Sequence, residues 1–94
     1  MTVEIVTPEA TLFKGTVQAV SVPGVEGEFQ MLDNHAPIVS ILGQGHVKLV
    51  GQGLNFEREV ENRFQKVNAT TFWLPIASGT IEMKNNHVIV LADA

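Results

Sequence analysis

The sequence predicts an all-β protein, a two-sheet antiparallel β-sandwich of about ten strands. Apolar and polar residues alternate in short segments, which is the period of a strand with one buried face. Gly, Pro and Asn separate these segments at short intervals, as is typical of sandwiches and barrels. A helical period occurs only within residues 54–67, so we expect little or no helix elsewhere.

Three strands are expected in the first quarter of the chain. Residues 3–6 form the first strand, which ends at the Thr-Pro pair of residues 7–8. Residues 12–13 form a short second strand. Residues 17–22 are rich in β-branched side chains and form the third, and the Pro-Gly pair at 23–24 is expected to end it.

The next three strands are equally short. Residues 29–32 form one strand, and the polar loop 33–37 follows it. Residues 38–42 resume the apolar pattern. The Gly-rich turn 43–45 then leads into residues 46–50, where apolar and polar side chains alternate.

The C-terminal region contains three further strands. Residues 72–76 alternate, and a turn is expected at residues 78–79 before the alternating strand 81–84. The two Asn residues at 85–86 suit a two-residue hairpin turn, because Asn tolerates positive φ. Residues 88–91 are apolar on both faces, which predicts a central strand.

Residues 54–67 admit two interpretations. Alternating Glu residues favour a long hairpin that turns at residues 61–62, and this is the interpretation we prefer. A helix remains the alternative, because four apolar residues are spaced by four, four and three positions. These residues are Phe56, Val60, Phe64 and Val67.

Composition restricts the classes of function. The 94 residues form one domain, 1–94, with 45% apolar residues, no Cys and a net charge of −4. The absence of Cys excludes disulfides and thiol nucleophiles. The six basic residues are scattered, which argues against nucleic acid and against a polybasic membrane contact. No apolar run is long enough for a membrane span, so direct membrane insertion is not expected.

No arrangement of residues predicts an enzyme. His35, His46 and His87 lie in separate segments without the spacing of a metal site. Ser21, Asp33 and His35 could be combined into a triad, but no nucleophile motif surrounds the Ser. We therefore expect no catalytic residues, no metal and no cofactor. The remaining candidate is the polar loop region 24–37, because binding functions concentrate on loops that a rigid sheet holds.

Several motifs in this region and beyond it resemble one known family. Residues 22–29 read VPGVEGEF, residues 32–38 read LDNHAPI, and residues 86–93 read NHVIVLAD. Their order and spacing resemble the N-terminal domain of the ε subunit of bacterial F-type ATP synthases. The Gly-x-Gly-x-Val-x-Leu strand at 43–49 and the segment 78–83 fit the same pattern.

The resemblance implies a ten-stranded sandwich and a place in the rotor. It implies a non-catalytic subunit that links γ to the polar loops of the c-ring and couples proton translocation to ATP synthesis. It also implies a peripheral position at the cytoplasmic face of the bacterial inner membrane. Carried over by residue, Glu28 faces the ring with Gly27 and Phe29 beside it, and His35 lies near γ.

The sequence departs from the family pattern in two places. Most members continue into two C-terminal helices, which are associated with inhibition of ATP hydrolysis and with ATP binding. This chain stops at Ala94, so we expect neither activity from it. Residues 53–68 lengthen the usual short hairpin, and the resemblance assigns them no role. The alternative function is a free-standing β-sandwich that binds a peptide or carbohydrate, although one Trp and no Tyr offer little for a sugar site.

Overall fold

Ten strands and one short 3₁₀ helix make up the fold in the computed structural model, which describes residues 1–94. The elements are β1 (Thr2–Val6), β2 (Thr11–Thr16), β3 (Ala19–Gly24), β4 (Gly27–Leu32), β5 (Ile38–Leu42), β6 (Gly45–Val50), η1 (Glu61–Arg63), β7 (Gln65–Asn68), β8 (Thr71–Ile76), β9 (Ser78–Lys84) and β10 (His87–Asp93).

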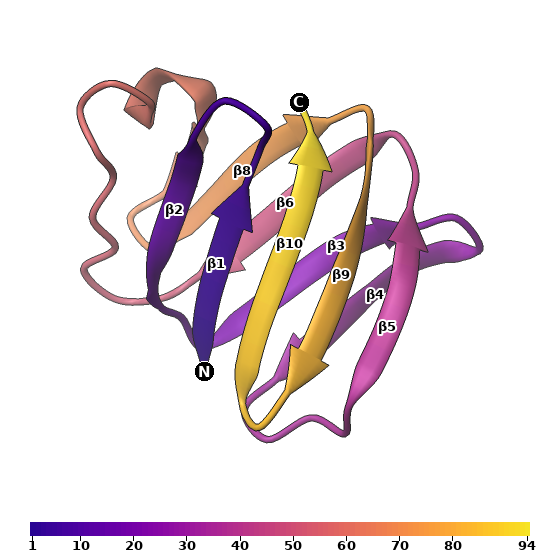
Figure 1. Cartoon of the computed structure of the whole chain (residues 1–94). Helices are drawn as coiled ribbons and strands as arrows, with labels where there is room; N and C mark the ends of the chain where they lie inside the picture. The colour runs from indigo at the N-terminus through magenta and orange to yellow at the C-terminus, as the bar shows by residue number, and fades with distance from the viewer.

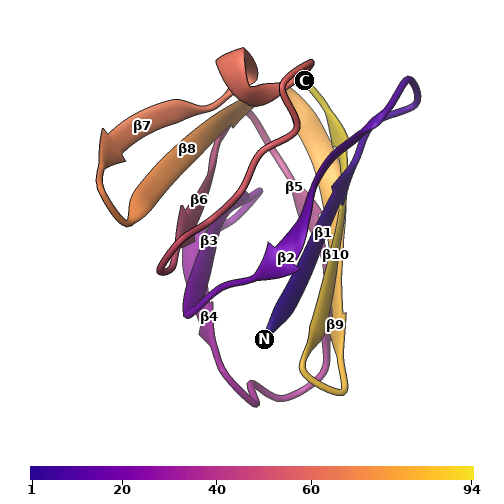
Figure 2. The same cartoon turned by 90° about the vertical axis from the view of Figure 1, so that its left-hand side faces the viewer.

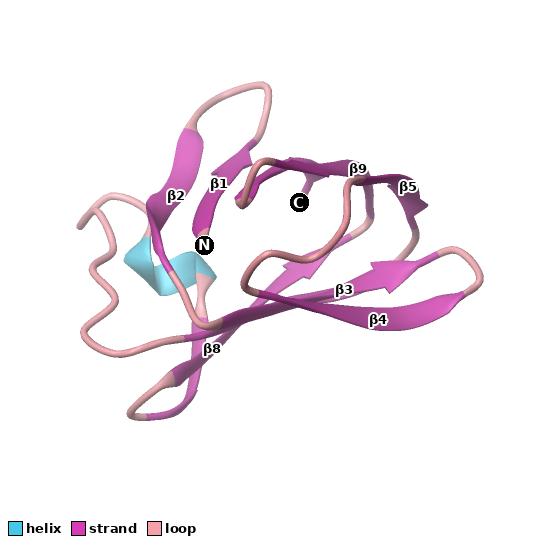
Figure 3. Ribbon diagram, turned by 90° about the horizontal axis from the view of Figure 1, so that it is seen from below, coloured by secondary structure: helices cyan, strands magenta, loops and turns pink.

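The strands form one sheet that curls back on itself into two layers (Figures 1 and 3). The first layer has the order β2-β1-β10-β9-β5, and the second has the order β4-β3-β6-β8-β7. A single residue pair, Gly24 opposite Leu42, joins β3 to β5 at the corner between the layers. The predicted two-layer β-sandwich of ten strands is therefore confirmed.

One detail of the predicted topology is wrong, because the sheet is mixed rather than purely antiparallel. Strands β1 and β10 run parallel, with Thr2 opposite His87 and Val6 opposite Leu91. Alternation of apolar residues identifies which face of a strand is buried, but it carries no information on strand direction. The pairing of the first strand with the last could not be read from local turns.

The core lies between the two layers, and the alternating residues of the inner faces fill it. Burying a side chain of the size of Val, Leu, Ile or Met stabilises the fold by about 1.5–3 kcal/mol. Fourteen core residues have at most 1% of their surface exposed: Val3, Ile5, Leu12, Val20, Val22, Met31, Leu42, Val47, Leu49, Leu74, Ile81, Met83, Val88 and Val90.

Local turn chemistry was predicted with mixed success. The Asn85–Asn86 turn is confirmed, with φ of 54° and 59°. The turn predicted at Ser78 and Gly79 is wrong, because β9 begins at Ser78 and pairs with β10 as far as Asp93. Ladder hydrogen bonds along the full length of β10 outweigh the local turn preference of a Ser-Gly pair.

The long hairpin preferred for residues 54–67 is also wrong, and so is a helix over that whole stretch. The chain forms a loop, the single turn η1, and then β7, which pairs with β8 (Figure 2). Val60 and Phe64 are buried, and Phe56 packs against the core cluster. The helical spacing therefore picked out the inward-facing residues although no long helix forms. Val67, the fourth member of that stripe, is 49% exposed.

This segment closes the open side of the sandwich, opposite the corner between β3 and β5. In Figure 2 it crosses in front of the gap between β2 and the pair β7–β8. The Phe56 ring lies 5.3 Å from Phe13, 4.4 Å from Phe64 and 4.7 Å from Phe72 between ring centroids. Phe13 belongs to the first layer and Phe72 to the second, so the aromatic cluster ties both layers together.

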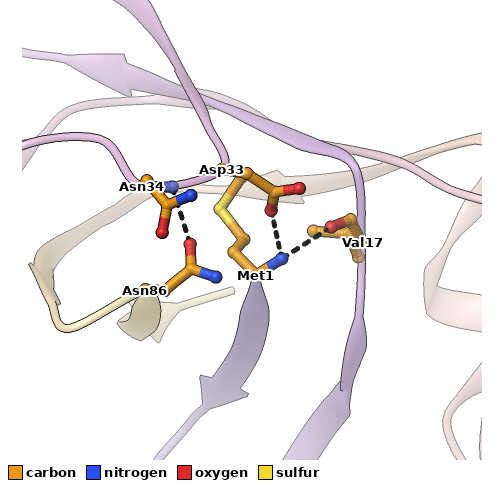
Figure 4. A network of polar contacts seen from close by, with 5 residues as sticks. All are labelled: Met1, Val17, Asp33, Asn34 and Asn86. Atoms are coloured by element: carbon orange, nitrogen blue, oxygen red, sulfur yellow. Dashed lines mark hydrogen bonds and ion pairs between the residues drawn. The ribbon is translucent and has the colours of Figure 1, made fainter.

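A second network ties down the loop that carries His35, at the end of the molecule where the chain begins (Figure 4). The α-ammonium of Met1 donates a hydrogen bond to the Val17 carbonyl over 3.1 Å and pairs with the Asp33 carboxylate. The backbone N–H of Asn34 donates to the side-chain oxygen of Asn86 over 2.8 Å. Two strand ends and the β9–β10 turn therefore hold the start of the loop.

Replacing Phe64 by Ala is expected to lower the free energy of unfolding by about 3–5 kcal/mol, because it removes a buried ring and leaves a cavity. Urea unfolding followed by circular dichroism measures this change. Val67→Ala is the control, and it should shift stability by less than about 0.5 kcal/mol, because Val67 is exposed. Equal effects of the two substitutions would show that the segment is not part of the core.

Replacing Asn86 by Gly is expected to loosen the His35 loop without breaking the turn. Glycine adopts the positive φ at this position, but it cannot accept the Asn34 hydrogen bond. Loss of a bond worth about 1 kcal/mol should speed amide exchange at Asn34 roughly fivefold. Asn85→Gly is the matched control, because Asn85 also has positive φ. Faster exchange at Asn34 in both variants would contradict the assignment.

Candidate functional site

The β3–β4 hairpin presents the three residues predicted to face the c-ring. Gly27 follows the turn with φ of 132°, a value that L side chains rarely adopt. Glu28 lies opposite Pro23 and points outward, whereas Phe29 lies opposite Val22. Phe29 is half-buried and packs against the core cluster, so it anchors the hairpin rather than projecting from it. Strand β3 runs to Gly24, so Pro23 and Gly24, which were predicted to end the strand, are its last two residues.

Glu28 is exposed, but it is not free. Its carboxylate oxygen Oε1 lies 2.8 Å from the Lys48 ammonium, and 52% of the Glu28 side chain remains exposed. Lys48 Nζ also lies 4.4 Å from the centre of the Trp73 ring. The His46 ring lies 5.3 Å from the same Trp. We call these four residues the outer polar cluster, because they lie on the outer face of the second layer.

His35 lies at the other end of β4. It is exposed in the loop between β4 and β5, and its ring nitrogen Nδ1 lies 2.7 Å from the Ala36 carbonyl. Its backbone N–H donates to the Leu32 carbonyl over 3.2 Å. Strand β4 has six residues, which at the usual strand rise separates its two ends by about 17 Å. The region 24–37, taken from the sequence as one polar surface, is therefore two turns at opposite ends of a strand.

The residues considered for catalysis are not assembled into a site. Ser21 lies in the middle of β3, whereas Asp33 and His35 lie in the loop after β4. Asp33 pairs with the Met1 ammonium. His87 lies 3.8 Å from Glu4 in the first layer, remote in the fold from His46 on β6. No group of three His, Cys, Asp or Glu side chains is arranged to hold a metal ion.

The sequence analysis missed an apolar surface on the outside of the first layer. Val39 is 77% exposed, Ile41 64% and Leu91 53%. They form two rows across β5, β9 and β10, because β9 places Glu82 between Val39 and Ile89, and Thr80 between Ile41 and Leu91. We call Val39, Ile41, Ile89 and Leu91 the outer apolar face.

The signal for this surface was present in the sequence. Residues 38–42 and 88–91 are apolar on both faces, a pattern typical of strands that are covered on both sides. Here only the inner side is covered. A shallow groove of about 600 Å³ continues the outer apolar face toward the β1–β2 turn, where Val6 and Pro8 line it. No helix in the structure is long and apolar enough to cross a lipid bilayer.

Comparison with solved structures agrees with the architecture. The chain aligns over its whole length with part of the central stalk and c-ring assembly of the Tetrahymena thermophila mitochondrial ATP synthase. The TM-score is 0.68, the sequence identity is 17%, and the alignment covers 63% of that chain. At this identity the match supports the sandwich fold alone.

Comparison with sequences identifies the family. The family described as "ATP synthase, Delta/Epsilon chain, beta-sandwich domain" matches residues 1–61. The ATP synthase epsilon chain of Leptospira interrogans is 33% identical over 97% of this chain, which spans 59% of that relative's length. The epsilon chain of Chlorobaculum tepidum is 34% identical over 98% of this chain, which spans 88% of that relative. The chain belongs to the delta/epsilon β-sandwich family of ATP synthase subunits.

Proposed function

We propose that this domain is a non-catalytic rotor subunit of a bacterial F-type ATP synthase, linking γ to the c-ring. The observation that carries the proposal is the similarity of nearly the whole chain to proteins named ATP synthase epsilon chain. In this role the domain couples proton translocation to ATP synthesis by transmitting rotation between its two partners. It would be attached to the cytoplasmic face of the inner membrane through the ring.

The proposed ring contact is the tip of the β3–β4 hairpin. Glu28 offers a half-exposed carboxylate beside Gly27, where no side chain restricts the approach of another backbone. A carboxylate forms strong, charge-assisted hydrogen bonds with Lys and Arg groups, and polar ring loops can supply these. Phe29 fixes the strand behind this tip by packing inward.

The proposed γ contact is the loop that carries His35. This loop is exposed, yet the Met1–Asp33 pair and the Asn34–Asn86 hydrogen bond hold its first residues. Since His35 and Glu28 lie at opposite ends of β4, one rigid strand separates the two contacts. That separation suits a subunit that bridges two partners.

The outer apolar face supports a role within an assembly. Its large apolar side chains are exposed in two rows with Glu82 and Thr80 between them, and exposed apolar residues gathered on one face are typical of a surface that a partner covers. The alternative, a free-standing sugar-binding module, needs an open aromatic face. Trp73, the single Trp, has Lys48 and His46 against its ring, so it does not offer one.

Two substitutions test the proposed contacts. Glu28→Gln and His35→Ala are each expected to change the free energy of unfolding by less than about 1 kcal/mol, because both side chains are exposed. Glu28→Gln should weaken capture of the purified c-ring, and His35→Ala should weaken capture of γ. Binding of each variant is compared with that of the unmodified chain by surface plasmon resonance. Normal capture of both partners by both variants would refute the assigned contacts.

A charge placed in the outer apolar face is expected to block assembly without unfolding the domain. Ile41→Asp puts a carboxylate at a position that is 64% exposed, so stability should change by about 1 kcal/mol or less. In a partner interface, the same buried charge should lower the yield of assembled γ complex at least tenfold. Gln65→Asp, on the exposed edge strand β7, adds the same charge as a control. Full assembly by Ile41→Asp would exclude this face from the interface.

A further inference from the structure

The outer polar cluster contains a lysine whose position is fixed from two sides. Lys48 is on β6, two strands away from Glu28 on β4, with β3 between them. Its ammonium meets the Glu28 carboxylate at 2.8 Å and the Trp73 ring at 4.4 Å. Only 26% of the Lys48 side chain is exposed. The aromatic ring therefore holds the cation in the place where it meets the carboxylate.

The contact with Lys48 restricts the side-chain conformations of Glu28 before any partner binds. An isolated Glu near the end of an exposed strand samples several rotamers, and binding must select one of them at a cost in entropy. Cation–π contact with Trp73 restricts Lys48 in turn, so less freedom is lost when the ion pair forms. Lys48 contacts Oε1 of Glu28, and about half of the Glu28 side chain remains exposed to a partner.

We propose that Lys48 is a positioning residue, which holds the Glu28 carboxylate in the orientation that accepts a hydrogen bond from a basic group on the ring. The inference rests on the proposed ring contact of Glu28. A second effect of Lys48 would change the affinity in the opposite direction. Lys48 also neutralises part of the Glu28 charge, and if that shielding dominated, removing Lys48 would strengthen the attraction to a basic partner.

The test measures affinity of the γ-bound chain for detergent-solubilised c-ring at fixed salt concentration. Lys48→Met should weaken binding about three- to tenfold, which is the effect of ordering one flexible side chain. Lys48→Arg should restore binding to within about twofold, because a guanidinium pairs with a carboxylate and stacks on Trp. Lys66→Met is the matched control, since Lys66 lies exposed on β7 at the far edge of the same layer. It should leave affinity unchanged.

A double variant separates positioning from direct contact. If Lys48 acts through Glu28, then adding Lys48→Met to Glu28→Gln should cause no further loss of affinity. Additive losses would mean that Lys48 touches the ring itself and would overturn the proposal. Tighter binding by Lys48→Met, or no change, would overturn it as well.

The isolated chain supplies a readout that does not depend on the ring. Trp73 is the only Trp and the chain has no Tyr, so its fluorescence reports the outer polar cluster directly. Lys48→Met should shift the emission of Trp73, and Lys66→Met should not. If the emission shifts but the unmodified chain fails to bind the ring, the proposed function fails while the local contact stands. If the emission does not shift, the positioning role fails by itself.

Discussion

Mutual burial of two apolar sheet faces is the constraint on which the rest of this structure depends. A layer of five short strands cannot bury its inner face alone, so the sheet curls at the Gly24–Leu42 corner until the two layers meet. That corner closes one side only. The aromatic cluster around Phe56 closes the opposite side, which makes residues 53–68 part of the core rather than an appendage. Since the inner faces are used for the core, the surfaces proposed to bind partners lie on the outer faces and at the two ends of the sandwich.

The parts of the fold that were predictable from the sequence are those with a local cause. Short apolar, β-branched or alternating segments located nine of the ten strands, and Asn85–Asn86 located a turn, because Asn tolerates positive φ. The parts that were not predictable depend on residues distant in the chain. No local sequence pattern indicates that β1 pairs with β10 in parallel. Likewise, Ser78 and Gly79 lie in a strand rather than a turn because they pair with β10. The alternating Glu residues of 54–67 have the pattern of a strand, which led to the wrong prediction of a hairpin. The apolar residues of this segment instead pack into the core from a loop and a single helical turn.

The same distinction holds for the candidate surfaces. Exposure of Glu28 followed from its place beside a turn, but its pairing with Lys48 required the register of three strands. The separation of Glu28 from His35 likewise required knowing that β4 runs between their two turns. The outer apolar face had a sequence signal in residues 88–91, which predicted a strand covered on both sides. In the proposed assembly a partner covers the outer side, and the sequence of this chain does not identify that partner.

The parallel pairing of β1 with β10 also governs how the molecule is made. During synthesis β1 leaves the ribosome first, and its only early neighbour is the β2 hairpin, since its other partner is the last strand of the chain. Isolated hairpins are marginal in water, and closing a loop that spans the whole domain is slow. The first layer therefore assembles after translation of β10. Until β10 is available, the apolar residues of β1 and β5 stay exposed, and exposed apolar strands of this kind are the parts of a folding chain that aggregate most readily.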